Sequence, residues 1–183
     1  MGKKLIAVCL SVVLLFTAFL GCARNKSSLP ELPLHDRVSE ITLNPVDERA
    51  DCDTLVFSCI DYRFAFANQE FINETLGLKN NYNHISVPGS IYNLVNPKTQ
   101  ELIIGKVTNL VNFHLIKHVV IIAHKDCGAY GGSSAFGSKF AEQEYLSADL
   151  RKARDILIEK YPILKVDLYL EELTPSGVVF EKV

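Results

Sequence analysis

The chain has 183 residues, of which 48% are hydrophobic and 22% are charged, and its formal net charge at pH 7 is −2. This length and apolar content are enough to bury the core of one domain of ordinary size. The sequence contains no cluster of lysines and arginines that could neutralise a phosphate backbone, so nucleic acid is not an expected partner.

The N-terminus has the layout of a bacterial export signal. Lys3 and Lys4 precede an uncharged run of 16 residues over 5–20, which is the basic start and hydrophobic middle of a signal peptide. Residues 19–22, Phe-Leu-Gly-Cys, resemble the lipobox of bacterial lipoproteins, where cleavage leaves the cysteine as a lipid-bearing N-terminus. An uncleaved membrane anchor is the alternative, but the run is short against the roughly 20 residues that span a bilayer.

The rest of the chain is expected to form one tethered domain. We predict a signal peptide over residues 1–21, a lipidated tether over residues 22–50 and a folded domain over residues 51–183. The tether holds three prolines and no sustained hydrophobic period, as linkers do. The protein is therefore expected to be exported and held at the bacterial cell envelope, on its periplasmic or extracellular face, through a lipid on Cys22.

From residue 53 onward, short β-branched runs alternate with longer helical patterns. Strands are expected at residues 54–58, 84–87, 119–123 and 166–170, with a short terminal strand at 178–180. Helices are expected at residues 64–76, behind Pro97 as far as His114, and along the face formed by Leu146, Leu150, Ala153 and Leu157. Such alternation is typical of βαβ units around a parallel sheet.

These elements predict an α/β fold with three layers, α/β/α. The central sheet is expected to be mostly parallel, with strand order 2-1-3-4 and a short C-terminal strand added. Cys59 directly follows the first strand, and His124 directly follows the third. Because the first and third strands are neighbours in this order, the crevice at their carboxyl ends is where ligands bind. The two segments can therefore meet there.

Cys59, His124 and Cys127 together predict a zinc site. Two thiolates and an imidazole are natural zinc ligands, and three protein ligands leave a fourth position for water or substrate, as in catalytic sites. Zinc would lower the pKa of a bound water and so supply a hydroxide nucleophile near pH 7. A Cys59–Cys127 disulfide is a competing interpretation for an exported protein, and two small buried cysteines with a core histidine are another.

Asp61 and Arg63 follow Cys59 closely and are the candidate catalytic pair. A carboxylate beside the metal can accept the proton of zinc-bound hydroxide, or it can bind zinc itself and fill the open position. A charge-assisted pair with Arg63 would favour the first use. The glycine-rich stretch 128–137 lacks the ending of a phosphate-binding loop, so a turn or lid near the metal is the expected structure.

The pattern Cys-x-Asp-x-Arg, followed by His-x-x-Cys-Gly, resembles the β-class carbonic anhydrases over roughly residues 53–183. The resemblance implies that Cys59, His124 and Cys127 bind zinc and that Asp61 and Arg63 form the gating pair. It also implies reversible hydration of carbon dioxide to bicarbonate and a proton, and a homodimer. Tyr62 differs from the serine of many family members, as do residues 87–90 from their usual turn.

Two other functions remain open at this point. The same fold and metal could hydrolyse carbon disulfide or carbonyl sulfide, which are also small linear molecules. Alternatively, the protein could be a catalytically silent zinc-binding lipoprotein in which Asp61 stays on the metal.

Overall fold

The computed structural model describes residues 52–79 and 81–183. Within this part of the chain, five strands form one sheet in the order β2-β1-β3-β4-β5. The strands are β1 (Thr54–Ser58), β2 (Asn83–Ser86), β3 (His118–His124), β4 (Lys165–Thr174) and β5 (Gly177–Lys182). Strands β2, β1, β3 and β4 are parallel, and β5 pairs antiparallel with β4. The predicted strand order is confirmed.

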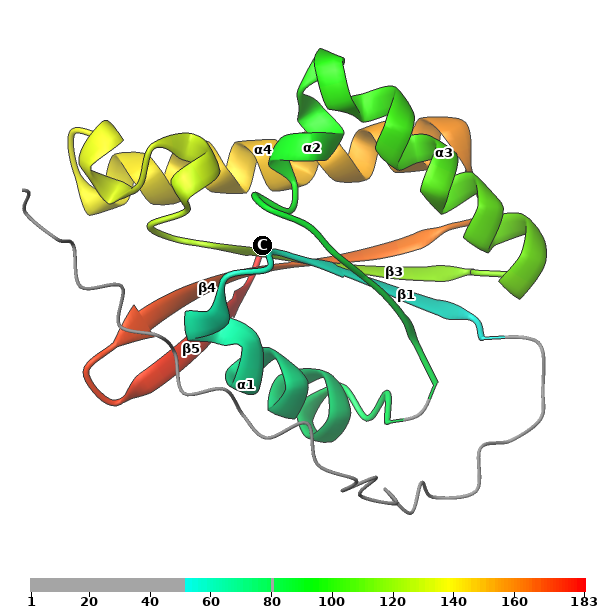
Figure 1. Ribbon diagram of the computed structural model, residues 1–183, viewed down its shortest axis with the longest axis horizontal. Helices are drawn as coiled ribbons and strands as arrows, with labels where there is room; N and C mark the ends of the chain where they lie inside the picture. The colour runs from blue at the N-terminus through cyan, green and yellow to red at the C-terminus, as the bar shows by residue number, and fades with distance from the viewer. Residues whose placement is uncertain (1–51, 80) are drawn as a thin grey trace, which may run out of the picture. The chain divides into compact units, whose positions relative to one another are not determined.

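Helices cover both faces of the sheet (Figure 1). The helix α1 (Tyr62–Glu70) continues as a π-helical turn, η1 (Phe71–Thr75), on one face. The helices α2 (Tyr92–Val95), α3 (Pro97–His114) and α4 (Lys139–Lys160) lie on the other face. The predicted α/β/α layering is therefore confirmed. The hydrophobic pattern does not predict α2, because one helical turn is too short for a periodic signal.

Side chains of the central strands pack in two separate hydrophobic clusters. Leu55 and Phe57 of β1 pack in the large cluster with residues of α2, α3 and α4. Val56 packs in a smaller cluster with Ile72 of η1. Successive residues of a strand point to opposite faces, so β1 needs an apolar or small side chain at every position. All five of its residues are buried.

Local side chains set the ends of the helices. Asn96 caps α3 by accepting a hydrogen bond from the backbone N–H of Lys98, and Pro97 occupies the first turn, where its missing N–H costs nothing. After η1, Gly77 adopts a φ of +66°, which suits a residue without a Cβ. The helix expected at 64–76 thus ends as predicted, but it begins two residues earlier, at Tyr62.

The topology brings the chemistry-bearing segments to one edge of the sheet. In the pairing of β1 with β3, Val56 lies opposite Val120, and both strands run in the same direction. Cys59 follows β1, and His124 is the last residue of β3. The predicted crevice between the ends of the first and third strands is therefore where both segments lie.

None of the helices in the described part of the chain is long and apolar enough to span a membrane. The predicted signal peptide at 1–21 and the tether at 22–50 lie outside the described residues. Their boundaries stay predictions.

Candidate metal centre

Three potential metal ligands converge at the carboxyl edge of the sheet. Cys59 leaves β1, His124 ends β3, and Cys127 lies in the turn after β3. The two sulfur atoms and a ring nitrogen of the histidine all lie within 4.8 Å of one another. These residues line a cavity of about 680 Å³. The structure thus brings together the three residues predicted to bind a metal.

The surroundings of His124 leave one ring nitrogen available. The residue is 1% exposed, and its ring lies 4.5 Å from the Phe64 ring, centroid to centroid. Its Nδ1 lies 2.8 Å from the carbonyl oxygen of Lys125, and because a carbonyl only accepts, Nδ1 donates. The buried Nε2 has no hydrogen-bond partner among the described residues. Such an orphaned nitrogen is costly in a protein interior, and a metal ion would satisfy it.

The two cysteine sulfurs interact, and their pKa values are shifted in opposite directions. The backbone N–H of Gly89 donates to the Cys59 sulfur at 3.2 Å. A hydrogen bond from the Cys127 thiol lowers the pKa of Cys59 to about 4, against the opposing effect of burial. The same contact, together with burial, raises the pKa of Cys127. Both cysteines are free thiols, so the alternative disulfide is not formed, and the donor set fits zinc.

Asp61 and Arg63 form a close pair at the start of α1. Asp61 is the N-cap, and its Oδ1 accepts from the backbone N–H of Arg63 at 3.0 Å. The guanidinium adds a bond from Nε to Oδ1 at 3.1 Å and one from Nη2 to Oδ2 at 2.7 Å. These bonds outweigh partial burial and lower the pKa of Asp61. Its Oδ2 lies 3.9 Å from Nε2 of His124, so the pair lies beside the ligand set.

Three further residues shape the site, and none of them is among the site residues predicted from the sequence. Gly89 holds the Cys59 sulfur, and Asp126 accepts a hydrogen bond from Arg63 at 2.7 Å. Glu171 lies opposite His124 in the pairing of β3 with β4 and is 0% exposed. Burial raises its pKa to about 8. Of these three residues, only Asp126 has a position in the sequence that indicates nearness to the site, because it stands between two predicted ligands.

The glycine-rich stretch after the last ligand is an ordered connection. It forms two short 3-10 turns, Gly128–Tyr130 and Ser133–Ala135. Gly128 and Ala129 line the cavity beside the ligand set. The stretch therefore covers one side of the site, as expected for a turn near the metal.

The family is shown by a direct match. The model of the family described as "Putative carbonic anhydrase" matches residues 49–172. The chain belongs to this family. A relative, the uncharacterized protein RC0076 of Rickettsia conorii, is 36% identical over 135 residues, which cover 70% of this chain and 71% of the relative. An uncharacterized protein of Rickettsia bellii is 33% identical over 135 residues, covering 70% and 80%.

Solved β-carbonic anhydrases resemble this family member in fold. CafD of Aspergillus fumigatus matches with a TM-score of 0.50 at 9% identity, over 77% of this chain and 94% of that protein. Isoform I of Trichomonas vaginalis matches with a TM-score of 0.46 at 11% identity, over 75% and 86%. The likeness to CafD shows a shared fold at low identity. The predicted resemblance to a divergent carbonic anhydrase is confirmed.

Proposed function

We propose that this carbonic anhydrase family member catalyses the zinc-dependent, reversible hydration of carbon dioxide to bicarbonate and a proton. One observation carries the proposal: two sulfurs and an unpartnered imidazole nitrogen meet beside a carboxylate–guanidinium pair. A zinc protein without catalysis needs the ligands, but it does not need the pair. Membership of the family supports the same reaction.

Cys59, His124 and Cys127 would hold the zinc ion, through the two sulfurs and Nε2. Catalytic zinc sites usually have three protein ligands and one open position. When bound, zinc supplies Lewis acidity, which lowers the pKa of a coordinated water towards neutrality. The hydrogen bond from Nδ1 to the Lys125 carbonyl fixes the tautomer in which Nε2 carries a lone pair.

Asp61 would act as an oriented hydrogen-bond acceptor in the cavity. Arg63 lowers its pKa, so the carboxylate is ionised at neutral pH and can accept a hydrogen bond from a water molecule. Hydrogen bonds from the backbone N–H, Nε and Nη2 of Arg63 fix its orientation. An oriented acceptor can align the lone pair of the attacking oxygen towards the substrate carbon.

The walls of the cavity suit a small uncharged substrate. Ile60, Pro88 and Ala129 add apolar surface beside the ligand set. Carbon dioxide has no charge to pair, so apolar walls can hold it without the cost of desolvating an ion. Carbon disulfide and carbonyl sulfide have the same shape and are the alternative substrates of this site.

Zinc content and carbon dioxide hydration, measured on the purified protein, test the proposal. We expect about one zinc ion per chain and loss of activity in Cys59→Ser and in His124→Ala. Full activity in either variant would contradict the zinc mechanism. Sulfide release from carbon disulfide or carbonyl sulfide, with no acceleration of carbon dioxide hydration, would favour the alternative substrates. A zinc site that keeps Asp61 as a ligand and stays inactive at alkaline pH would identify the silent lipoprotein.

We also propose an exported protein with a lipid on Cys22 that assembles as a homodimer. The signal-like residues 1–22 support the lipid anchor. Ile60, Tyr62 and Phe66 are 56%, 86% and 77% exposed, and such an apolar group near a site supports an interface. Radioactive palmitate should label the protein but not Cys22→Ala. Light scattering should give twice the chain mass, and a monomer would contradict the dimer.

A further inference from the structure

Arg63 is shared between two carboxylates. Its Nε and Nη2 donate to Asp61, while Nη1 donates to Oδ2 of Asp126 at 2.7 Å. Nη2 also donates to the backbone oxygen of Asp126 at 3.1 Å. Each of the three guanidinium nitrogens therefore donates at least one hydrogen bond. The bonds to Asp61 serve the catalytic pair, and the bonds to Asp126 need an explanation of their own.

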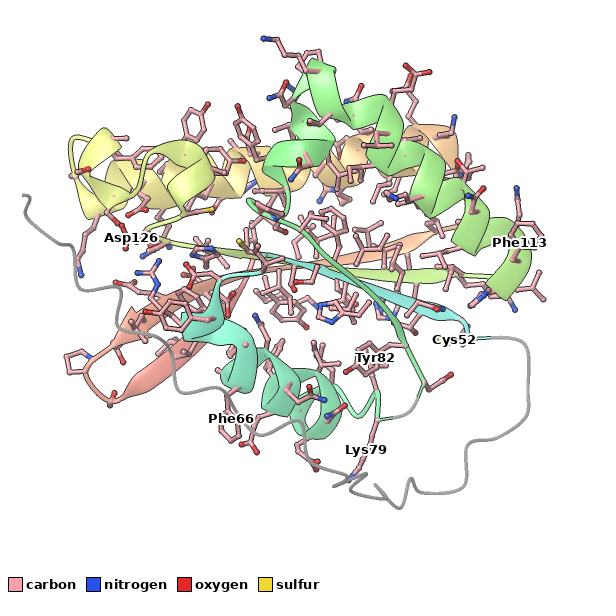
Figure 2. The ribbon with its side chains drawn as sticks, viewed as in Figure 1. Cys52, Phe66, Lys79, Tyr82, Phe113 and Asp126 are labelled. Atoms are coloured by element: carbon pink, nitrogen blue, oxygen red, sulfur yellow. The ribbon has the colours of Figure 1, made fainter. Side chains whose placement is uncertain are left out.

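Asp126 is itself held by hydrogen bonds to its own loop and to α4. Its Oδ1 accepts from the backbone N–H of Ser133 at 3.0 Å, and its own N–H donates to Oε1 of Glu142 at 2.7 Å. Glu142 belongs to α4 and is 1% exposed, and its Oε2 accepts from the Ser133 hydroxyl at 2.8 Å. Figure 2 shows Asp126 in the connection that leaves β3. A chain of hydrogen bonds thus leads from the buried carboxylate of Glu142 through Asp126 to Arg63.

The backbone of Asp126 is held in an uncommon conformation. Asp126 has a φ of +59°, a region that side-chain-bearing residues enter at a cost, with Asp and Asn among the most tolerant. A Cβ added to Gly132 would lie 3.1 Å from Oδ1 of Asp126, so the loop folds tightly around this carboxylate. Such a conformation persists where the surrounding contacts determine it.

We propose that Asp126 is a positioning residue that locks Arg63 and thereby keeps Asp61 off the metal, a role that rests on the proposed zinc function. Asp61 Oδ2 lies 3.9 Å from Nε2 of His124, so a small movement would bring the carboxylate to a metal held by that nitrogen. Ordering a long arginine side chain costs conformational entropy. In the structure, hydrogen bonds to both Asp61 and Asp126 offset this cost. Without Asp126, only the hydrogen bonds to Asp61 would hold the Arg63 side chain in place.

Thiocyanate binding to the cobalt(II)-substituted protein tests this role. Asp126→Asn keeps an oxygen for the N–H of Ser133 and tolerates the positive φ, so the loop should fold as before. We expect thiocyanate to bind about tenfold more weakly than in the wild type, because Asp61 would take the position that the anion needs. Loss of a negative charge alone would act in the opposite sense and tighten anion binding.

Asp61→Ala supplies the matched background. No carboxylate of residue 61 can close the site there, so adding Asp126→Asn should not weaken thiocyanate binding. Asp155→Asn removes an exposed carboxylate paired with Arg154 and should behave as the wild type. Unchanged or tighter binding in Asp126→Asn alone would overturn the proposal. An equal weakening in the Asp61→Ala background would overturn it too.

The cobalt spectrum separates this proposal from the proposed function. Thiolate-to-cobalt charge-transfer bands report whether Cys59 and Cys127 bind the metal at all. Their absence in the wild type would refute the zinc site, and the role of Asp126 with it. Normal bands with thiocyanate affinity unaffected by Asp126→Asn would refute the role of Asp126 alone.

Discussion

Gly89 lies where the connection after β2 passes close to the connection after β3. Its φ is +81°, and a Cβ added there would lie 2.5 Å from the Cβ of Ala129, nearer than carbon atoms pack. Gly89→Ala should therefore lower the free energy of unfolding by about 2–4 kcal/mol. It should also weaken zinc retention, because the N–H of Gly89 holds the Cys59 sulfur. Urea unfolding and zinc content measure the two effects.

Gly105 in α3 is the matched control for that substitution. A Cβ added to Gly105 meets nothing within 4 Å, and alanine is the better helix former. Gly105→Ala should therefore raise the free energy of unfolding by about 0.5–1 kcal/mol. If the two substitutions destabilised the protein equally, close approach would not explain the glycine at position 89.

Glu171 is a buried carboxyl group with an incomplete set of partners. One oxygen accepts from the Asn68 amide at 3.3 Å, and Oε2 has no partner among the described residues. Burial raises its pKa to about 8, so the folded protein carries mainly the neutral acid at pH 7. Glu171→Gln should change the free energy of unfolding by less than about 1 kcal/mol. Glu171→Ala should lower the free energy of unfolding by about 2–4 kcal/mol. Urea unfolding measures both variants, and equal losses in Glu171→Gln and Glu171→Ala would show that the charge of Glu171 is needed.

Among the elements, β4 is tied to both neighbouring strands through Asp167. Its carboxylate lies 3.0 Å from Lys165 Nζ, 2.9 Å from Lys182 Nζ and 2.8 Å from His118 Nε2. Burial by itself raises the pKa of Asp167, but the hydrogen bonds from these three side chains outweigh it and hold the pKa well below its usual range. His118 belongs to β3 and Lys182 to β5, so the group joins three strands.

The stability that Asp167 supplies should depend on pH in one direction. Its folded pKa lies below the unfolded value of about 3.9, so the contribution is present above that pH and disappears as the pH falls towards the folded pKa. Asp167→Asn should cost about 1–2 kcal/mol at pH 7. The difference in the free energy of unfolding between Asp167→Asn and the wild type should narrow as the pH falls from about 5 to about 2. Urea unfolding at several pH values measures it, and a gap independent of pH would contradict the ionic origin.

Elements differ in how well the sequence predicts them, for physical reasons. The bounds of β1 match the expected 54–58 because burial on both faces requires apolar or small side chains at successive positions. The five candidate site residues are predictable because they stand beside strand ends that the topology brings together. The bond between Arg63 and Asp126, which lie 63 positions apart, is not predictable in this way. It depends on a loop conformation that no periodic pattern encodes.

At the scale of the whole molecule, the ligand set joins the ends of β1 and β3 with the connections that follow them. Cys59 directly follows β1, His124 ends the neighbouring β3, and Cys127 belongs to the loop that leads to α4. A metal bound to all three would act as a cross-link between these parts. Because the unfolded chain lacks this arrangement, metal binding should stabilise the folded state.

Removal of zinc should therefore lower the melting temperature and expose a reactive thiolate. We expect a fall of about 5–10 °C after chelation, recovered on adding zinc. The pKa of Cys59 in the metal-free pair is about 4, so iodoacetamide should alkylate it readily at pH 6, and zinc should protect it. Cys52, whose thiol bonds the Thr54 carbonyl, serves as the internal reference in mass spectrometry. Alkylation of Cys59 that is indifferent to zinc would show that this sulfur does not bind the metal.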